Sequence, residues 1–275
     1  MEKHLLVTVS EHSAYSAGLR FACGCFDEPA RVRLTLLYVM PPYEEASAEG
    51  ALARTKAQSL LDGAQAWAAS QKIPFGNIET KALARQFGVL RDIIEEARKG
   101  LYDAAVVGSR YLSRLEQMYE DSVSRGLLWE AVDFPVWICH QPDAQRRNLL
   151  LCLDGDEASY RIADHAAFML HDSPRHSVTL LHFRREGMDS KAVVDKGRDI
   201  LLRNGMSAVR INTLVMDSTT PVESILRIAD EDSYAVVAVG RNKRHPDTFF
   251  SRLFTQSVTL RLKENTQRFA LWVSQ

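Results

Sequence analysis

The stretch AAVVGSRYLSRLEQMYEDSVSRG, residues 104–126, holds the residues whose types and spacing come nearest to those of a ligand site. Its apolar run ends in Gly108 and a serine, and a helical segment follows. Many α/β proteins hold a phosphate at such a strand-to-helix turn, because glycines let backbone amides approach the phosphate oxygens. Tyr111 and Asp121 stand where further glycines would be useful. The stretch is therefore a nucleotide site, a modified one, or the remains of one.

The elements that must position this stretch occur twice along the chain. Four blocks recur in the same order, the first two at an offset of 144 residues and the later two at offsets of 132 and 135, which is the pattern that loop insertions and deletions produce. The matching pairs are LLVTVSEHSAYSAGLRFA (from Leu5) with LLLCLDGDEASYRIADHAAFM (Leu149), RLTLLYVMPP (Arg33) with SVTLLHFRRE (Ser177), LYDAAVVGSR (Leu101) with SYAVVAVGRN (Ser233), and DSVSRGLLWEAVDFPVWICH (Asp121) with QSVTLRLKENTQRFALWVSQ (Gln256). A repeat this long predicts two domains in tandem rather than a solenoid.

Each half predicts strands alternating with helices. Continuous apolar runs indicate strands covered on both faces, and the alternation indicates a right-handed, doubly wound parallel sheet in each domain. Gly100 is expected to cap the helix before it. In the first half the predicted strands are Leu5–Val9, Val32–Met40, Ile78–Ala84, Ala104–Val107 and Pro135–His140, and the predicted helices are Ala14–Cys25, Ala46–Ser70, Val89–Lys99 and Asp121–Ala131.

The polar segment HQPDAQRRN, residues 140–148, separates the two halves. We therefore predict domains over residues 1–143 and 144–275, joined by a short linker. The chain has 275 residues, 46% of them hydrophobic and 25% charged, and a net charge of −1. Without a basic surplus or a long apolar segment, we expect no nucleic-acid partner, no membrane partner and a cytoplasmic location. Cys23 and Cys25 lack a second ligand pair, so no metal site is predicted.

In doubly wound sheets, ligands bind beyond the carboxyl ends of the strands. This rule places the turns after the first, second and fourth strands of each half in the candidate site. The chain therefore offers two sites, which need not be equivalent.

The order LLVTV, LTLLYV, YDAAVVGSR and DSVSRGLLWEAVDFPVWIC resembles the universal stress protein family, and the chain resembles its tandem two-domain members over nearly its whole length. The resemblance implies a five-stranded, adenine nucleotide alpha hydrolase-like sheet of strand order 3-2-1-4-5 in each domain. It also implies that the final strands, PVWICH with Trp137 and FALWVSQ with Trp272, pair the domains as a pseudo-dimer within one chain. Homodimerisation of the chain is a further option.

Nucleotide-binding members of this family carry a glycine, two residues, a second glycine, nine residues, and a Gly-Ser or Gly-Thr pair. The first half keeps the spacing with Gly108 at the first position and Ser122 at the last, but has Tyr111 and Asp121 at the other two. In the second half Gly240 matches, the loop is three residues longer, and Ser257 ends it. By this resemblance the phosphate-binding residues are Gly108, Ser109, Arg110, Ser122 and Val123 in the first half, and Gly240, Arg241 and Ser257 in the second.

Binding members also carry an acidic residue after the first strand, against the adenosine portion of the ligand. Asp154, followed by Gly155, keeps this position in the second half, whereas the first half has Ser10. Several of these residues have a purely structural alternative: Gly108 as a turn, Ser122 and Asp154 as helix caps, and the basic run after Gly240 as a solvated loop. By the resemblance, neither site is complete.

We therefore expect a regulatory or protective protein that acts by binding a partner protein, with degenerate adenine-nucleotide sites and no enzymatic activity. The first alternative is a genuine sensor of ATP or AMP, with Mg²⁺, that has one functional site. The second alternative is a slow ATP hydrolase, which fold analogy alone supports.

Overall fold

The computed structural model describes residues 2–10, 16–42, 47–108, 134–240 and 269–274. The chain divides into two compact units, unit 1 (Met1–Cys139) and unit 2 (His140–Gln275), and each is described by itself. Among the described helices, none has the length and apolar character that a membrane crossing requires.

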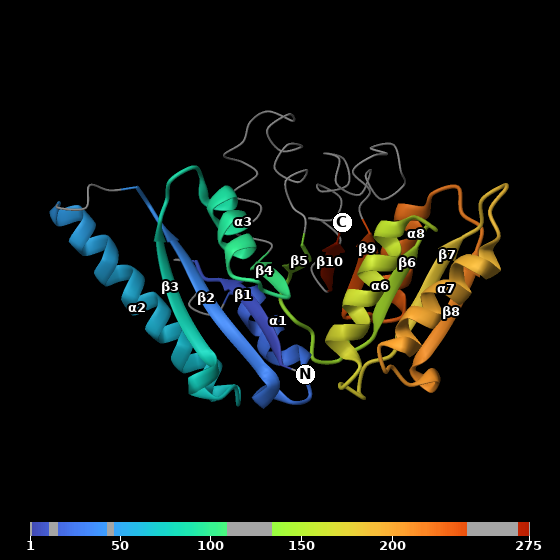
Figure 1. Ribbon diagram of the computed structural model, residues 1–275, viewed down its shortest axis with the longest axis horizontal. Helices are drawn as coiled ribbons and strands as arrows, with labels where there is room; N and C mark the ends of the chain where they lie inside the picture. The colour runs from blue at the N-terminus through green and yellow to red at the C-terminus, as the bar shows by residue number, and fades with distance from the viewer. Residues whose placement is uncertain (1, 11–15, 43–46, 109–133, 241–268, 275) are drawn as a thin grey trace. The chain divides into compact units, whose positions relative to one another are not determined.

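Strands and helices alternate along both units (Figure 1). The described elements of unit 1 are β1 (Lys3–Thr8), α1 (Ala17–Cys25), η1 (Pro29–Arg31), β2 (Val32–Met40), α2 (Ala48–Ser70), η2 (Phe75–Asn77), β3 (Ile78–Ala84), α3 (Val89–Lys99), β4 (Ala104–Gly108) and β5 (Val136–Cys139). Those of unit 2 are β6 (Leu149–Leu153), α6 (Glu157–Leu170), β7 (Val178–Phe183), α7 (Ser190–Arg203), η3 (Ala208–Arg210), β8 (Ile211–Met216), α8 (Pro221–Glu231), β9 (Val236–Gly240) and β10 (Ala270–Ser274).

The two units share one strand order. It runs β3-β2-β1-β4-β5 in unit 1 and β8-β7-β6-β9-β10 in unit 2, and every recorded strand pair within a unit is parallel. The register agrees as well: Leu5 faces Leu34, and Leu149 faces Val178, which keeps the offset of 144 residues found in the sequence. The predicted α/β fold with strand order 3-2-1-4-5 is confirmed.

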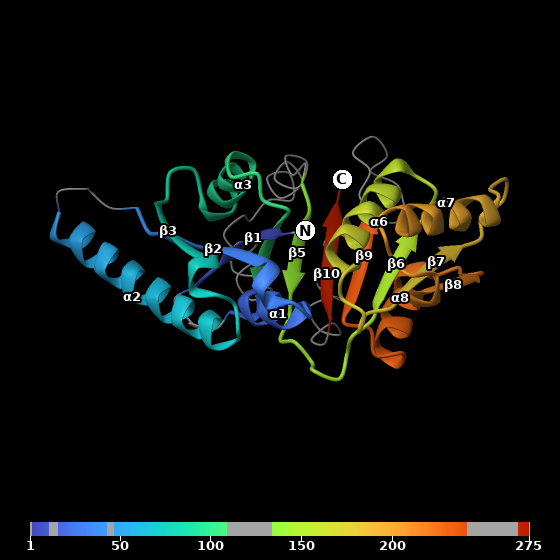
Figure 2. The ribbon, with the colours of Figure 1, turned by 60° about the horizontal axis from the view of Figure 1, so that its bottom comes forward.

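Helices cover both faces of each sheet. In unit 1, α1 and α2 lie on one face and α3 on the other; in unit 2, α6 and α7 lie on one face and α8 on the other (Figures 1 and 2). This arrangement is the one that right-handed crossovers require when the chain builds three strands in one direction and then returns past the first strand to add the fourth. The inner strands β4, β6, β7 and β9 are buried throughout, because both faces are covered.

Trp137 and Trp272 are fully buried at equivalent places in the last strand of each unit. The Trp137 ring packs edge-on against Phe21, with ring centroids 6.1 Å apart, and the Trp272 ring packs in the same way against His165, at 5.8 Å. Phe21 and His165 are themselves 144 positions apart, so the helix contact repeats along with the strand. Both tryptophans contribute to the core of their own unit; the predicted pseudo-dimer stays a prediction.

The structure corrects two local expectations. Of the predicted helix Ala14–Cys25, the described part begins at Ala17, with Ser16 as its N-cap. Gly100 does cap α3, but with ordinary right-handed dihedral angles, and the left-handed residue is Leu101 (φ 51°). A Cβ at Gly100 would lie 2.0 Å from the Tyr102 ring, so any larger residue there would require this ring to move. The predicted helix Asp121–Ala131 lies outside the described residues.

Candidate functional site

The carboxyl end of β6 carries the buried acid that the sequence singled out. Asp154 is only 5% exposed, and its Oδ1 accepts a hydrogen bond from the Asp156 backbone amide at 3.0 Å. Burial raises the pKa of the Asp154 carboxyl group, while the hydrogen bond that it accepts from the Asp156 amide opposes this shift. The chain thus holds a carboxyl group in a place where its charge is costly, and perturbed carboxyl groups cluster at binding and catalytic sites.

Gly155 turns the chain from β6 into α6. Its φ of +90° lies in the left-handed region that favours glycine. An added Cβ would also lie 3.2 Å from both Sδ and Cε of Met188, a residue of the segment between β7 and α7. This turn therefore favours glycine, and the segment after β7 packs directly against it.

Gly240 ends β9 beside the first turn of α6. A Cβ at this position would lie 2.2 Å from the carbonyl carbon of Ala158 and 2.3 Å from the amide nitrogen of Ser159. Only glycine lets the α6 backbone approach β9 this closely. The structure thus brings Asp154, Gly155 and Gly240 together around the N-terminus of α6, and it gives Gly240 a packing role in addition to the predicted one.

The helix end is rich in acidic groups. Asp156 is the N-cap of α6, and Glu157 lies in its first turn. Lys196 of α7 offsets part of this charge: its Nζ lies 3.6 Å from Glu157 Oε2 and 3.8 Å from the centroid of the Tyr160 ring. Such a site favours a ligand that donates hydrogen bonds to carboxylates over one that brings several negative charges.

The corresponding end of unit 1 has different chemistry. Ser10 follows β1 in place of an acid. Ser16 caps α1 by accepting a hydrogen bond from the Leu19 amide at 3.3 Å, and its hydroxyl donates to the Thr8 carbonyl oxygen at 3.0 Å. Near Gly108, the closest described atoms to an added Cβ are the backbone nitrogens of Ala17 and Gly18, both at 3.8 Å. Gly108 therefore has more room than Gly240.

Several predicted site residues lie outside the described part of the chain. These are Ser109, Arg110, Ser122, Val123, Arg241 and Ser257, together with the substituted positions Tyr111 and Asp121. Their assignment to phosphate binding stays a prediction.

Three residues around Asp154 were not predicted from the sequence: Ser159, Tyr160 and Lys196. Ser159 adds a hydroxyl next to the carboxyl group and also donates to the Asp156 carbonyl oxygen at 2.7 Å. The pKa of Tyr160 is raised by burial and by the nearby negative charges of Asp154 and Glu157. Ser159 and Tyr160 had a signal, since they fall one turn into a helix that follows an acid, but Lys196 lies 42 positions from Asp154 (154 to 196). Among the described residues, no cluster of three His, Cys, Asp or Glu side chains could hold a metal ion.

Comparison with known proteins identifies the fold. No protein-family model matches the chain, and no curated protein matches its sequence. Solved structures do match: a universal stress protein from Archaeoglobus fulgidus DSM 4304 aligns with a TM-score of 0.66 and 16% identity over 99% of this chain and 96% of its own. A functionally unknown protein, PA1789 from Pseudomonas aeruginosa PAO1, aligns with a TM-score of 0.55 and 12% identity over 99% and 92% of the two chains. A universal stress protein in complex with cAMP matches over 46% of this chain and 95% of its own, with a TM-score of 0.36 and 17% identity. The chain therefore has the universal stress protein fold.

Proposed function

We propose that this protein is a regulatory universal stress-type protein that binds one adenine nucleotide, in unit 2, and acts through a partner protein. The observation that carries the proposal is the buried Asp154 carboxyl group at the carboxyl end of β6, held beside the α6 N-terminus and Gly240. The matching position of unit 1 is Ser10. The nucleotide site is accordingly assigned to unit 2 alone.

A ribose fits the chemistry of Asp154. A buried carboxylate is stabilised by hydroxyl donors, and acidic side chains hydrogen-bond ribose hydroxyls in other doubly wound folds. The Asp156 amide already donates to Oδ1, and Ser159 lies next to the group, so the remaining lone pairs suit one or two hydroxyls from a ligand. The adenosine portion of the ligand would lie against this carboxyl group.

The charge of the site favours a ligand with few phosphates. Asp154, Asp156 and Glu157 place three carboxyl groups within one short turn of chain, and Lys196 and Arg185 supply opposing charge nearby. A triphosphate would be repelled unless Mg²⁺ bridged it to these groups. We therefore propose that AMP binds more tightly than ATP in the absence of Mg²⁺.

A second candidate function is partner binding with no nucleotide at either unit. In unit 1, the capped helix α1 favours partner binding without a nucleotide, because the Ser16 hydroxyl already accepts from an α1 amide that an anion would use. In unit 2, the raised pKa of Asp154 argues against it, since a structural cap gains little from a carboxyl group whose charge is costly.

Calorimetric titration with AMP, ATP and ATP plus Mg²⁺ tests the proposal. We expect one site per chain, AMP binding in the micromolar range, and weaker binding of Mg²⁺-free ATP. Asp154→Ala should abolish the heat, whereas Ser10→Ala, the matched change in unit 1, should leave binding unchanged.

Thermal unfolding provides an independent measurement. A ligand at 100 times its dissociation constant should stabilise the folded protein by about 2.7 kcal/mol. If millimolar AMP gives neither heat nor a thermal shift, the second candidate function replaces the first. Two equivalent sites, or full binding by a folded Asp154→Ala variant, would contradict the assignment to unit 2.

A further inference from the structure

The edge strand of unit 1 turns half of its backbone groups away from the sheet. Among the described strands, β3 has a neighbour on one side only, which is β2. The Arg85 amide donates to the Met40 carbonyl oxygen of β2 at 3.1 Å, and the direction of backbone groups alternates along a strand. Residues 79, 81 and 83 therefore turn their N–H and C=O groups toward β2, and residues 78, 80, 82 and 84 turn theirs outward.

Most of these outward groups are open. Gln65 of α2 donates to the Ile78 carbonyl oxygen at 2.8 Å. Thr80, Ala82 and Ala84 are exposed, and among the described residues none bonds to their outward groups. The end of α2 lies near the start of β3, and the two elements diverge from there (Figures 1 and 2). The open stretch of this edge is therefore residues 80–84.

β3 lacks the usual protection of an open edge. Natural edge strands are shielded by proline, by bulges or by a lysine that faces the solvent. β3 contains no proline, and its register with β2 runs unbroken from Ile78 to Ala84. Its one lysine, Lys81, is turned toward α3, where its Nζ lies 2.7 Å from Glu96 Oε1. A further strand can therefore add to this edge.

The sequence of the open stretch is complementary to itself. In an antiparallel pair with a two-fold axis at Ala82, Ala82 lies opposite itself and Thr80 lies opposite Ala84. These three residues then exchange about six backbone hydrogen bonds, because each pair of opposite residues exchanges two. Glu79 lies opposite Arg85 of the second copy, so opposite charges meet at both ends of the pair.

The neighbouring registers are less favourable. With the axis at Lys81, the two lysines lie opposite each other, and like charges in this position destabilise a strand pair. With the axis at Thr80, the Ile78 backbone would have to bond across to Ala82, but its carbonyl oxygen already accepts from Gln65. The axis at Ala82 uses only groups that are open.

The edge strand of unit 2 does not share these properties. β8 begins in the same way, with Arg198 donating to the Ile211 carbonyl oxygen, but its last three residues are half-buried. Val215 is the fifth residue of β8, as Ala82 is of β3. An axis at Val215 places Thr213 opposite Asp217, and no opposite charges meet.

We infer that β3 is an interface at which two copies of this chain pair as antiparallel strands centred on Ala82. The sheet of unit 1 then continues into that of the second copy. A second copy is favoured over an unrelated extended peptide, because both the open backbone groups and the charges of β3 match their own two-fold image. The pairing uses no residue of the proposed nucleotide site and does not depend on it.

Analytical ultracentrifugation of the full chain tests this interface. We expect a reversible equilibrium between monomer and dimer. Ala82→Pro removes one outward N–H from each copy, and proline is tolerated on an edge strand where its nitrogen faces the solvent. The dissociation constant of the dimer should rise by about tenfold or more, because two hydrogen bonds are lost per dimer. Val215→Pro, the matched change in β8, should leave the dissociation constant unchanged.

Disulfide trapping tests the register, and it also tests the interface if Ala82→Pro does not fold. Opposite residues of a hydrogen-bonded antiparallel pair have Cα atoms about 5.5 Å apart, which suits a disulfide, so Ala82→Cys should form a cross-linked dimer under mild oxidation. In Thr80→Cys, the matched control, the two thiols lie about 13 Å apart along the strands, and cross-linking should be at least about tenfold slower. The four native cysteines are buried.

Two results from sedimentation would overturn the inference. One is a wild type that stays monomeric at about 100 µM, and the other is a dimer with the same dissociation constant in Ala82→Pro and Val215→Pro. Cross-linking of Thr80→Cys at a rate equal to or above that of Ala82→Cys would contradict the axis at Ala82.

Discussion

In unit 1 the chain leaves β1 at Ser10 and enters α1 through Ser16, whose hydroxyl caps the helix. In unit 2 it leaves β6 at the buried Asp154 and enters α6 three residues later. The strand order and register around these turns are the same in both units. Two units with the same strand order and register thus differ at the strand ends, where unit 2 has a buried carboxyl group and unit 1 a serine.

Alanine substitution of the glycines that end β4 and β9 should give the largest difference in stability loss between the two units. In Gly240→Ala, the new Cβ would meet the α6 backbone at 2.2 Å, so α6 must move, and we expect a loss of about 3 kcal/mol or more from unit 2. Gly108→Ala, with 3.8 Å to the nearest described atoms, should cost about 0.5 kcal/mol or less. Urea denaturation followed by circular dichroism measures both. Equal losses would show that the two helix–strand contacts are alike.

The next largest difference in stability loss should come from Asn77 and Arg210, which end the short helices η2 and η3. Arg210 donates to four carbonyl oxygens around the end of α6, those of Leu170, His171, Ser173 and His176, at 2.7–3.0 Å. Its counterpart Asn77 donates to two, those of Ala30 and Val32, at 3.0 and 3.3 Å.

Removing each donor leaves its acceptors without that partner. We expect Arg210→Met to cost about 3 kcal/mol and Asn77→Ala about 1 kcal/mol, because four hydrogen bonds from a charged donor contribute more than two from a neutral amide. Denaturant midpoints, with unchanged slopes, measure these losses. A larger loss for Asn77→Ala would contradict the comparison.

The buried acid should give unit 2 a pH dependence of stability. Because the folded-state pKa of Asp154 is raised above the usual aspartate value of 3.8, the folded state binds more protons than the unfolded state in the window just above that value. Stability contributed by this group is therefore present at low pH and is lost as the pH rises through the folded-state pKa.

Asp154→Asn removes this titration but keeps an oxygen that can accept from the Asp156 amide. The variant should gain stability over the wild type as the pH rises from 4 to 7, by about 1 kcal/mol, which is the scale of one buried polar group. Ser10→Ala should show no such trend. Denaturation at pH 4, 5, 6 and 7 checks the sign, and an Asp154→Asn variant that is less stable at pH 7 would contradict the role of burial.

The smallest effects should come from the starts of the edge strands, where the two units are most alike. The Gln65 side chain donates to the Ile78 carbonyl oxygen at 2.8 Å, and Arg198 donates to the Ile211 carbonyl oxygen at 3.1 Å. Each helix thus covers one carbonyl at the start of its edge strand. Gln65→Ala and Arg198→Ala should each cost about 1 kcal/mol. Hydrogen exchange of the edge strands should accelerate equally in the two variants. Acceleration in only one variant would show that the two units differ at the starts of their edge strands as well.

Much of the fold could be predicted because it depends on local pattern. Val32–Met40 and Ile78–Ala84 are strands with the predicted bounds, and Val89–Lys99 is the predicted helix, since apolar periodicity and turn residues mark each of them. For α2, apolar spacing predicts one buried face made by Leu52, Leu60, Leu61, Ala64 and Trp67, and this prediction was partly wrong. Leu61 and Ala64 are buried, together with Gly50, Ala57 and Ala68, but Leu52 is 70% exposed.

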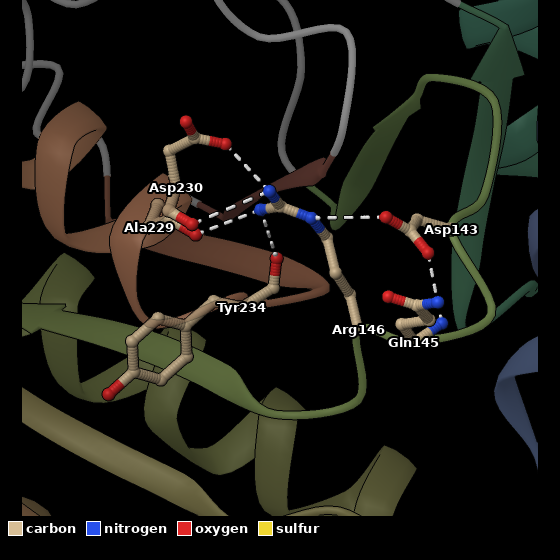
Figure 3. Close-up of polar contacts among 6 residues, drawn as sticks. All are labelled: Asp143, Gln145, Arg146, Ala229, Asp230 and Tyr234. Carbon is tan, nitrogen blue, oxygen red and sulfur yellow. Dashed lines mark hydrogen bonds and ion pairs between the residues drawn. The ribbon is translucent and has the colours of Figure 1, made fainter.

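Of the candidate site, the sequence could predict the places of Asp154 and Gly155, because both follow directly from the end of β6. Their role in binding a ligand stays a prediction. Gly240 was assigned to phosphate approach, yet its contact is with the backbone of Ala158, 82 positions away in the chain (158 to 240). Arg146 was assigned to a polar linker because its partners Ala229 and Asp230 (Figure 3) lie more than 80 residues later in the sequence. Composition does not report contacts between residues so far apart.

Photo-crosslinking with 8-azido-AMP, followed by mass-spectrometric mapping of the labelled peptide, tests the central claim most directly. The account predicts labelling within unit 2 alone, competition by unlabelled AMP, and loss of the label in Asp154→Ala but not in Ser10→Ala. Competable labelling of unit 1, or labelling that survives the loss of the Asp154 carboxyl group, would contradict it.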